Sequence, residues 1–318
     1  MAILGQDIQR AKALLMAGEL VAIPTETVYG LAGNAFDPRA VATIYEVKNR
    51  PTFNPLITHT DQLEKASHYL QTIPPLAKKL ADTFWPGPLT LLLPKADTLP
   101  DLVTAGSDLV AVRIPQHPLT LSLLQQLDFP LAAPSANPSG YISPTTADHV
   151  SEQLGHKISY ILDGGPCSVG IESTIVGVED DTIVIYRFGG ISTEDLRRIS
   201  KSVRFHENKS HDQPAAPGML TSHYAPSKKV IVGNLAELIP QYPSQEIGLI
   251  SFQKVYSQVP EENQRVLSES GDVKEAAQRL FSALRQLDKS LVKVILVEPV
   301  PNYGLGRAIN DRLARASA

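Results

Sequence analysis

The spacing of hydrophobic residues divides the first two hundred positions into alternating helices and strands. Apolar residues recur at helical spacing from Asp7 to Met16, and Asp37 followed by Pro38 marks the start of a helix that ends near Lys48. Further helices are predicted over 76–84, 119–127 and 147–154, and strands over 20–23, 56–59, 89–93, 109–114, 131–133 and 160–163. This alternation predicts an α/β fold.

Two neighbouring strand-like segments modify this picture. Residues 173–178 and 183–186 are joined by the acidic turn of Glu179, Asp180 and Asp181. Such a short connection predicts an antiparallel pair, because parallel strands need a longer crossover. We therefore expect a mixed sheet.

The pattern changes after a helix predicted near 193–200. Residues 201–217 are polar and lack apolar periodicity, which predicts a linker. Beyond it, strands near 230–232, 247–250 and 292–297 alternate with helices near 235, 273–287 and 305–316, which predicts a second α/β unit. We expect domains over 1–208 and 229–318, joined by an interdomain segment over 209–228.

Composition excludes several classes of protein. The 318 residues carry a net charge of −4, and the first 208 hold 16 basic and 22 acidic side chains, so any RNA contact must be local. The only cysteine, Cys167, cannot form an internal disulfide, which favours a reducing, cytoplasmic setting. The N-terminus lacks a basic leader with an apolar stretch, and the apolar runs are too short to span a membrane.

Common catalytic motifs are absent from the sequence. It contains no phosphate-binding P-loop, H-E-x-x-H, paired C-x-x-C or G-x-S-x-G segment, and no histidines spaced i, i+4 on a helix. Cys167 has no adjacent base, so we expect a packed thiol rather than a nucleophile. No metal-ligating residues are predicted.

Polar and cationic residues instead collect at predicted strand ends. The segment 24–31 follows one strand directly, where α/β sheets bind ligands, although polar turns are often purely structural. Lys48 and Arg50 could simply be exposed charges that complement a helix dipole. Arg113 ends an apolar strand and needs an anionic partner if it is buried. Together with Arg187 these side chains predict a pocket for a polyanionic nucleotide and a small zwitterion.

Many short motifs in a fixed order produce a family resemblance. Residues 24–31, 48–56, 85–90, 113–115, 134–140, 163–165 and 172–175 resemble the successive motifs of the YrdC-like L-threonylcarbamoyladenylate synthases. Residues 217–219, 223–226 and 304–313 resemble the linker and second domain of the long form. The resemblance implies a YrdC-like twisted mixed sheet with helices and a smaller Rossmann-like C-terminal domain.

The resemblance also implies a reaction. L-threonine, bicarbonate or carbon dioxide, and ATP would yield threonylcarbamoyl-AMP and pyrophosphate, and a tRNA threonylcarbamoyl-transferase would use the product to modify adenosine next to the anticodon. Such a nucleotidyltransferase needs positioning and charge stabilisation, because the substrates supply both nucleophile and electrophile. Magnesium is expected with ATP, although no carboxylate cluster identifies its ligands.

Site residues follow from the same resemblance. Those expected to bind L-threonine are Thr27, His59, Arg113, Ala133 and Ser173. Those expected to bind ATP are Lys48, Arg50, Asn54, Leu109, Ser135, Ser143, Arg187 and Tyr224. Lys48 and Arg50 are expected to be catalytic. The family often has glycine where Asn49 stands and a hydroxyl residue where Leu109 stands, so Leu109 could contact the nucleotide only through its backbone.

Two alternative functions stay open from the sequence. One is a non-catalytic RNA-binding or ribosome-assembly factor, which the acidic first domain disfavours. The other is an enzyme that adenylates a carbamate on another substrate, as in hydrogenase maturation, which the absence of acylphosphatase-like and zinc-finger segments disfavours. The apolar and aromatic residues Met219, His223 and Tyr224 predict that the interdomain segment serves as a lid over the nucleotide.

Overall fold

The computed structural model describes residues 1–206, 216–217 and 224–318. The elements of its first unit are β1 (Ile3–Gly5), α1 (Ile8–Met16), β2 (Val21–Ile23), β3 (Gly30–Asn34), α2 (Pro38–Lys48), β4 (Ile57–His59), α3 (Leu63–Ala66), α4 (Pro75–Phe84), β5 (Leu89–Pro94), α5 (Asp101–Thr104), β6 (Leu109–Arg113), α6 (Pro118–Gln125), β7 (Leu131–Ala132), α7 (Ala147–Leu154), β8 (Tyr160–Leu162), β9 (Thr174–Glu179), β10 (Thr182–Arg187), α8 (Thr193–Ile199) and β11 (Val203–Phe205).

Helix ends follow local chemistry. Asp37 caps α2 by accepting a hydrogen bond from the amide of Arg39, and Pro38 occupies the first turn. The helix ends at Asn49, whose φ of 50° lies in the left-handed region. Glycine and asparagine adopt this conformation most readily, which explains why asparagine can replace the family's glycine there.

The strands of the first unit form a mixed sheet with the order β1-β8-β2-β3-β7-β4-β6-β5-β9-β10-β11. The expected antiparallel pair is confirmed, because β9 and β10 pair antiparallel across the acidic turn. Strands β4 and β6 are parallel, and their register sets His59 opposite Arg113. Residues far apart in sequence therefore meet at the carboxyl ends of two neighbouring strands.

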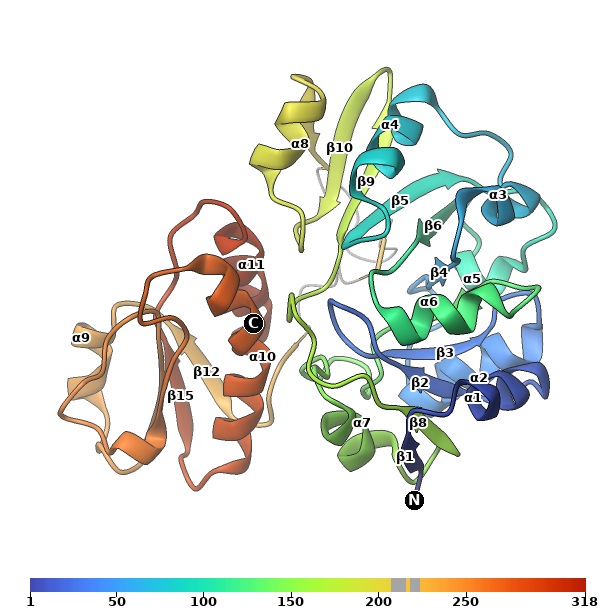
Figure 1. The fold of residues 1–318 in the computed structure, drawn as a ribbon. Coiled ribbons are helices and arrows are strands. Elements are labelled where there is room, and N and C mark those ends of the chain that lie inside the picture. The colour runs from blue at the N-terminus through green and yellow to red at the C-terminus, as the bar shows by residue number, and fades with distance from the viewer. Residues whose placement is uncertain (207–215, 218–223) are drawn as a thin grey trace.

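The second unit is a smaller α/β layer. Its elements are β12 (Lys229–Val232), α9 (Leu235–Leu238), β13 (Ile247–Ser251), β14 (Gln264–Val266), α10 (Val273–Lys289), β15 (Val294–Val297) and α11 (Gly306–Ala316). Its four strands are parallel, in the order β12-β15-β13-β14. Helices α10 and α11 lie on the side that faces the first unit, and α9 lies on the far side (Figure 1).

One apolar cluster runs through this interface. Val28, Ile142 and Ile171 of the first unit are buried in the same cluster as Leu280 and Leu284 of α10. A separate, larger cluster lies under the first sheet, where it includes Ile44, Leu80 and Val112. Hence the first unit has its own core, and the second unit covers an apolar face of the first.

The structure corrects several sequence predictions. Strands β1, β3 and β14 were not predicted, and β11 lies within the segment 201–217 that was interpreted as linker. Its residues pair in parallel with β10 from Ile183 to Ile185. The expected domain limits stay a prediction. The predicted lid falls mainly on 209–215 and 218–223, outside the described residues, and the same holds for its residues Met219 and His223.

Candidate functional site

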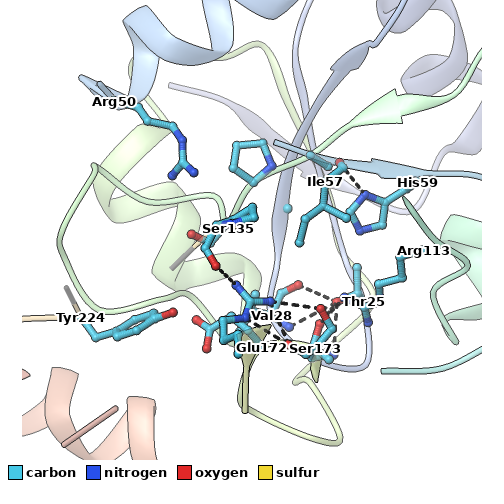
Figure 2. A pocket seen from close by; sticks show the side chains of 16 residues that line it. Thr25, Val28, Arg50, Ile57, His59, Arg113, Ser135, Glu172, Ser173 and Tyr224 are labelled. Carbon is cyan, nitrogen blue, oxygen red and sulfur yellow. Dashed lines mark hydrogen bonds between the residues drawn. The ribbon is translucent and has the colours of Figure 1, made fainter. Parts of the chain in front are cut away.

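A pocket lies where several strand ends meet Pro217 and Tyr224 of the interdomain segment. Nine of the predicted site residues line it: Thr27, Arg50, His59, Arg113, Ala133, Ser135, Ser173, Arg187 and Tyr224. Figure 2 shows Arg50 and Tyr224 on one side of the pocket and His59 and Arg113 on the other. The two sides hold residues predicted for different substrates, which fits a site for two ligands.

Arg113 ends β6 and is buried against the loop that follows β2. Its Nη1 donates to Thr27 Oγ1 at 2.8 Å, its Nε donates to the Gly87 carbonyl at 3.2 Å, and its Nη2 lies 2.7 Å from Glu26 Oε1. The anionic partner expected for a buried arginine is therefore Glu26. A guanidinium has five N–H groups, so donors remain for a ligand carboxylate, which would share this charge with Glu26.

His59 ends the neighbouring strand β4. Its Nδ1 lies 3.2 Å from the carbonyl oxygen of Ile57. Burial, with a further contribution from Arg113, lowers the pKa of His59 to about 3. The imidazole is therefore neutral near pH 7, and it can recognise a ligand by hydrogen bonding but not by charge.

Lys48 and Arg50 flank the left-handed residue that ends α2. Lys48 is only 1% exposed, and its Nζ donates to the carbonyl of Ser135 at 2.6 Å and to that of Asn137. Burial and the nearby Arg50 charge hold the pKa of Lys48 well below its usual value. The expectation of exposed helix-end charges is wrong for both residues, since Arg50 is also buried.

The two cations nevertheless occupy different places. Lys48 lies outside the pocket lining and fixes the loop that carries Ser135, whereas Arg50 lines the pocket. Arg50 is oriented by Asn54, whose Oδ1 accepts from Nη2 at 2.6 Å, and by the carbonyl of Pro55 at 2.9 Å. Asn54 therefore orients Arg50 from outside the lining. Any contact of Lys48 or Asn54 with ATP stays a prediction.

Arg187 joins the strand ends to the interdomain segment. Its Nη2 donates to the carbonyl of Ser173 at 2.9 Å and to Ser173 Oγ at 3.1 Å, and its Nη1 donates to the Pro217 carbonyl at 3.0 Å. Ser173 Oγ also lies 2.7 Å from Thr90 Oγ1. Pro217 of the interdomain segment is thus hydrogen-bonded directly to the pocket wall.

Two predicted nucleotide residues lie behind the lining. Ser143 is fully buried and donates to Glu172 Oε1 at 2.5 Å. Leu109 packs in an apolar cluster with Ala216 and Ile57. Ala133 does line the pocket, and its amide donates to the Ile57 carbonyl at 2.9 Å.

Glu172 is a pocket residue that sequence reasoning missed. Its carboxylate lines the pocket, is 6% exposed, and accepts from Ser143 and from Arg312 Nε at 2.8 Å. Arg312, Arg187 and Ser143 hold its pKa below the usual value despite burial. An acidic residue at the start of an apolar strand was a signal, but its partner lies in the other unit. Thr25, Val28, Gly30, Ile57, Pro134 and Pro217 complete the lining.

Two carboxylates lie at or near the pocket, Glu172 in its lining and Glu26 outside it, and both are engaged by arginines. Glu26 pairs with Arg113 and accepts from the amide of Gln116 at 3.0 Å, while Glu172 pairs with Arg312. Among the described residues, no cluster of three or more histidine, cysteine or acidic side chains could hold a metal. The expected Mg²⁺ stays a prediction, with ATP phosphates and water as its fitting ligands.

Two remaining expectations concern the thiol and the membrane. Cys167 is buried, and burial raises the pKa of its thiol, as expected for a packed residue. No helix in the described part of the chain has the length and apolar character needed to cross a bilayer.

Comparison with known proteins connects both units to one family. The family model described as "Telomere recombination", for Sua5, YciO and YrdC, matches residues 13–189. A second model, "Threonylcarbamoyl-AMP synthase, C-terminal domain", matches residues 191–318. The threonylcarbamoyl-AMP synthase of Pyrococcus abyssi is 42% identical over 98% of this chain and 94% of its own length. That of Bacillus subtilis is 39% identical, with 98% and 93% covered.

Solved structures agree with these matches. The crystal structure of P. abyssi Sua5 complexed with L-threonine has a TM-score of 0.91 and 40% identity, covering all of this chain and 97% of that one. E. coli YciO matches with a TM-score of 0.52 and 21% identity over 59% of this chain and 96% of its own, which supports the fold alone. The chain therefore belongs to the Sua5/YciO/YrdC family.

Proposed function

We infer that the protein is an L-threonylcarbamoyladenylate synthase, an enzyme that forms threonylcarbamoyl-AMP and pyrophosphate for tRNA modification. The observation that carries this inference is the nearly full-length match to the P. abyssi and B. subtilis synthases, which includes the second unit. The pocket supports it, because three arginines and several hydroxyl groups surround one cavity. No observation favours a non-catalytic RNA-binding role or another carbamate substrate.

The chemistry needs no protein nucleophile. Bicarbonate releases carbon dioxide and hydroxide, and the neutral amine of L-threonine adds to the carbon dioxide. The nitrogen gives up a proton as the carbamate forms, and this proton and the hydroxide combine to water. A carbamate oxygen then attacks the α-phosphorus of ATP, the bond to the bridging oxygen breaks, and pyrophosphate leaves with that electron pair. The protein has to orient two substrates and neutralise charge that develops on phosphate oxygens.

Each side of the pocket is proposed to bind one substrate. We propose that L-threonine lies against Thr27, His59, Arg113, Ala133 and Ser173. Arg113 recognises the carboxylate, and neutral His59 offers a hydrogen bond without adding a second positive charge.

ATP is proposed to lie on the opposite side. Arg50 and Arg187 are the pocket cations proposed to bind its phosphates, and Ser135 and Tyr224 offer hydroxyl groups. Lys48, Asn54 and Ser143 support these residues from behind, and Leu109 has only backbone atoms to offer a nucleotide. Magnesium would accompany ATP and neutralise its phosphates.

Two further proposals concern the cellular setting. The product is a reactive mixed anhydride, and we propose that a transferase that acts on tRNA consumes it and that the protein acts in the cytoplasm with that partner. Direct contact of this chain with RNA would have to be local, because the first 208 residues carry more acidic than basic side chains.

One assay tests the proposed function. The pure protein is incubated with ATP, magnesium and labelled bicarbonate, with and without L-threonine, and the products are analysed for pyrophosphate and a labelled adenylate. We expect both products only when L-threonine is present. Pyrophosphate release that does not depend on L-threonine and yields no labelled adenylate would contradict the proposal and indicate hydrolysis of ATP by water.

A further inference from the structure

Two buried arginines of the second unit reach across the interface into the first. Arg285 of α10 donates from Nε to the Ser143 carbonyl at 3.3 Å and from Nη2 to Gln153 Oε1 at 2.9 Å. Arg312 of α11 is fully buried and contacts a residue that lines the pocket. Burying a guanidinium is costly unless its N–H groups are paired, so these contacts need an explanation.

The guanidinium of Arg312 joins the ends of two strands. Its Nε donates to Glu172 Oε2 at 2.8 Å, just before β9, and its Nη2 donates to the Phe188 carbonyl at 2.8 Å, just after β10. Its Nη1 donates to Asp311 Oδ2 at 2.6 Å within its own helix. Arg312 therefore holds together the strand ends that also carry Ser173 and Arg187.

The same guanidinium lies against Tyr224. Its Cζ is 4.9 Å from the centre of the Tyr224 ring, which stacks on Phe281 of α10 at 5.6 Å between ring centres. Tyr224 has a φ of 66°, a conformation that needs support from its surroundings in a residue with a bulky side chain. Arg312 and Phe281 provide that support, and the phenol points into the pocket (Figure 2).

These contacts lead mainly to residues proposed to bind or support ATP, namely Tyr224, Arg187 and Ser143. Glu172 binds Ser143 and lies next to Ser173, whose carbonyl orients Arg187. Within the part of the chain that the structure describes, Arg312 bonds to neither His59 nor Arg113, which line the other side. Of the five residues proposed for L-threonine, all of which the structure describes, Ser173 alone lies next to these contacts, and its hydroxyl is also held by Thr90. We therefore expect loss of the Arg312 side chain to weaken ATP binding more than L-threonine binding.

We propose that Arg312 is a positioning residue for ATP, which acts from the second unit through Glu172 and Tyr224. Its ion pair fixes the position of the Glu172 carboxylate, and its guanidinium packs against the Tyr224 ring. The second unit thus helps to form the nucleotide site, in addition to packing against the first unit. This inference rests on the proposed function, because it assigns one substrate of that reaction.

The test compares substrate dependence in Arg312→Lys and Arg312→Ala. The lysine variant keeps a positive charge near Glu172 but loses the planar fork and the stacking contact. We expect each variant to raise the KM for ATP about tenfold or more, the loss expected for one oriented charge-assisted hydrogen bond. The KM for L-threonine should stay within about twofold of the wild-type value.

A matched control uses another cation that crosses the same interface. Lys289 of α10 pairs with Glu152 of α7 on the surface, and neither residue lines the pocket. Lys289→Ala should change neither KM by more than about twofold, because exposed ion pairs contribute little. Titration calorimetry with ATP alone and with L-threonine alone gives the same comparison without turnover.

The outcomes separate this inference from the proposed function. A selective loss of ATP affinity in Arg312→Lys supports positioning, and partial recovery relative to Arg312→Ala supports it further. Equal changes for both substrates, or a lower melting temperature with both KM values unchanged, would show a purely structural role. If the wild-type protein forms no adenylate, the proposed function fails, whereas unchanged ATP affinity in Arg312→Lys overturns only the positioning role.

Discussion

Individual side chains in the pocket are held by the protein in specific charge states. Arg113 forms an ion pair with Glu26, Glu172 forms an ion pair with Arg312, and His59 is neutral because burial lowers its pKa. Each pairing reduces the cost of burying a charge and leaves a defined set of hydrogen-bond donors. Substitutions at this scale therefore affect stability and binding together.

Arg113→Ala is predicted to weaken L-threonine binding strongly and ATP binding little. It should also lower the free energy of unfolding by about 3–5 kcal/mol, because Glu26 would remain buried without its partner. Calorimetric titration with each substrate and urea unfolding measure the two effects. Arg113→Met combined with Glu26→Gln should recover part of the stability but not the L-threonine affinity. Lost ATP affinity with normal L-threonine affinity would contradict this assignment.

His59 is predicted to make the fold less stable in acid. Its pKa is about 3 in the folded protein against about 6.5 unfolded, so the unfolded state takes up the proton first as the pH falls. Stability from neutral His59 is complete above pH 6.5 and is lost toward pH 3. Between pH 7 and pH 5 the wild-type protein should lose about 2 kcal/mol more unfolding free energy than His59→Gln. Equal losses in both proteins, measured by urea unfolding, would exclude this role.

At the scale of elements, α2 and the loop after β7 form one structural unit. The helix ends at Lys48, and the ammonium group of that residue binds the carbonyls of Ser135 and Asn137 in the loop. The amide of Ser139 returns a hydrogen bond to the Lys48 carbonyl at 2.8 Å. The end of one helix therefore sets the position of Ser135 in the pocket.

Lys48→Met is predicted to destabilise the protein by about 2–4 kcal/mol, because it keeps the side-chain length but leaves two buried carbonyls unpaired. Adenylate synthesis should fall as the loop moves. Lys78→Ala is the control, since Lys78 forms an exposed ion pair with Asp82 within α4 and should change the unfolding free energy by less than about 0.5 kcal/mol. Thermal and urea unfolding measure both. A melting temperature unchanged in Lys48→Met would show that the hydrogen bonds of Lys48 to the loop do not stabilise the fold.

At the scale of the whole molecule, the second unit completes the first. It covers Val28, Ile142 and Ile171 with apolar residues, and it supplies the partner of Glu172. The first unit has its own core, so we expect it to fold without this cover. Its pocket, however, includes a carboxylate whose counter-ion belongs to the other unit.

Truncation after Asn208 is predicted to leave a folded first domain with a lower melting temperature, by about 10 °C, because Glu172 loses its ion pair. Adenylate synthesis should fall sharply. Circular dichroism and the pyrophosphate assay on the truncated and full-length chains measure both properties. Full activity and unchanged melting in the truncated domain would show that the second unit contributes nothing to the site.

The sequence by itself determined the elements that local chemistry specifies. The cap at Asp37, the proline after it and helical periodicity fixed α2, and the acidic turn determined the antiparallel pair β9 and β10. It missed the short strand β11, because three residues in a polar segment carry no periodic signal. Ordered motifs also identified the family and nine residues that line the pocket.

Only the tertiary structure decided which charges are paired and which side chains reach the pocket. Lys48 and Arg50 are two residues apart, yet one binds a loop and the other lines the cavity. Arg312 pairs with Glu172, which lies 140 positions earlier in the sequence. Glu26 lies in the loop after β2, and it pairs with Arg113 at the end of β6. Local patterns cannot specify such pairs, because burial and charge compensation depend on how distant segments pack against each other.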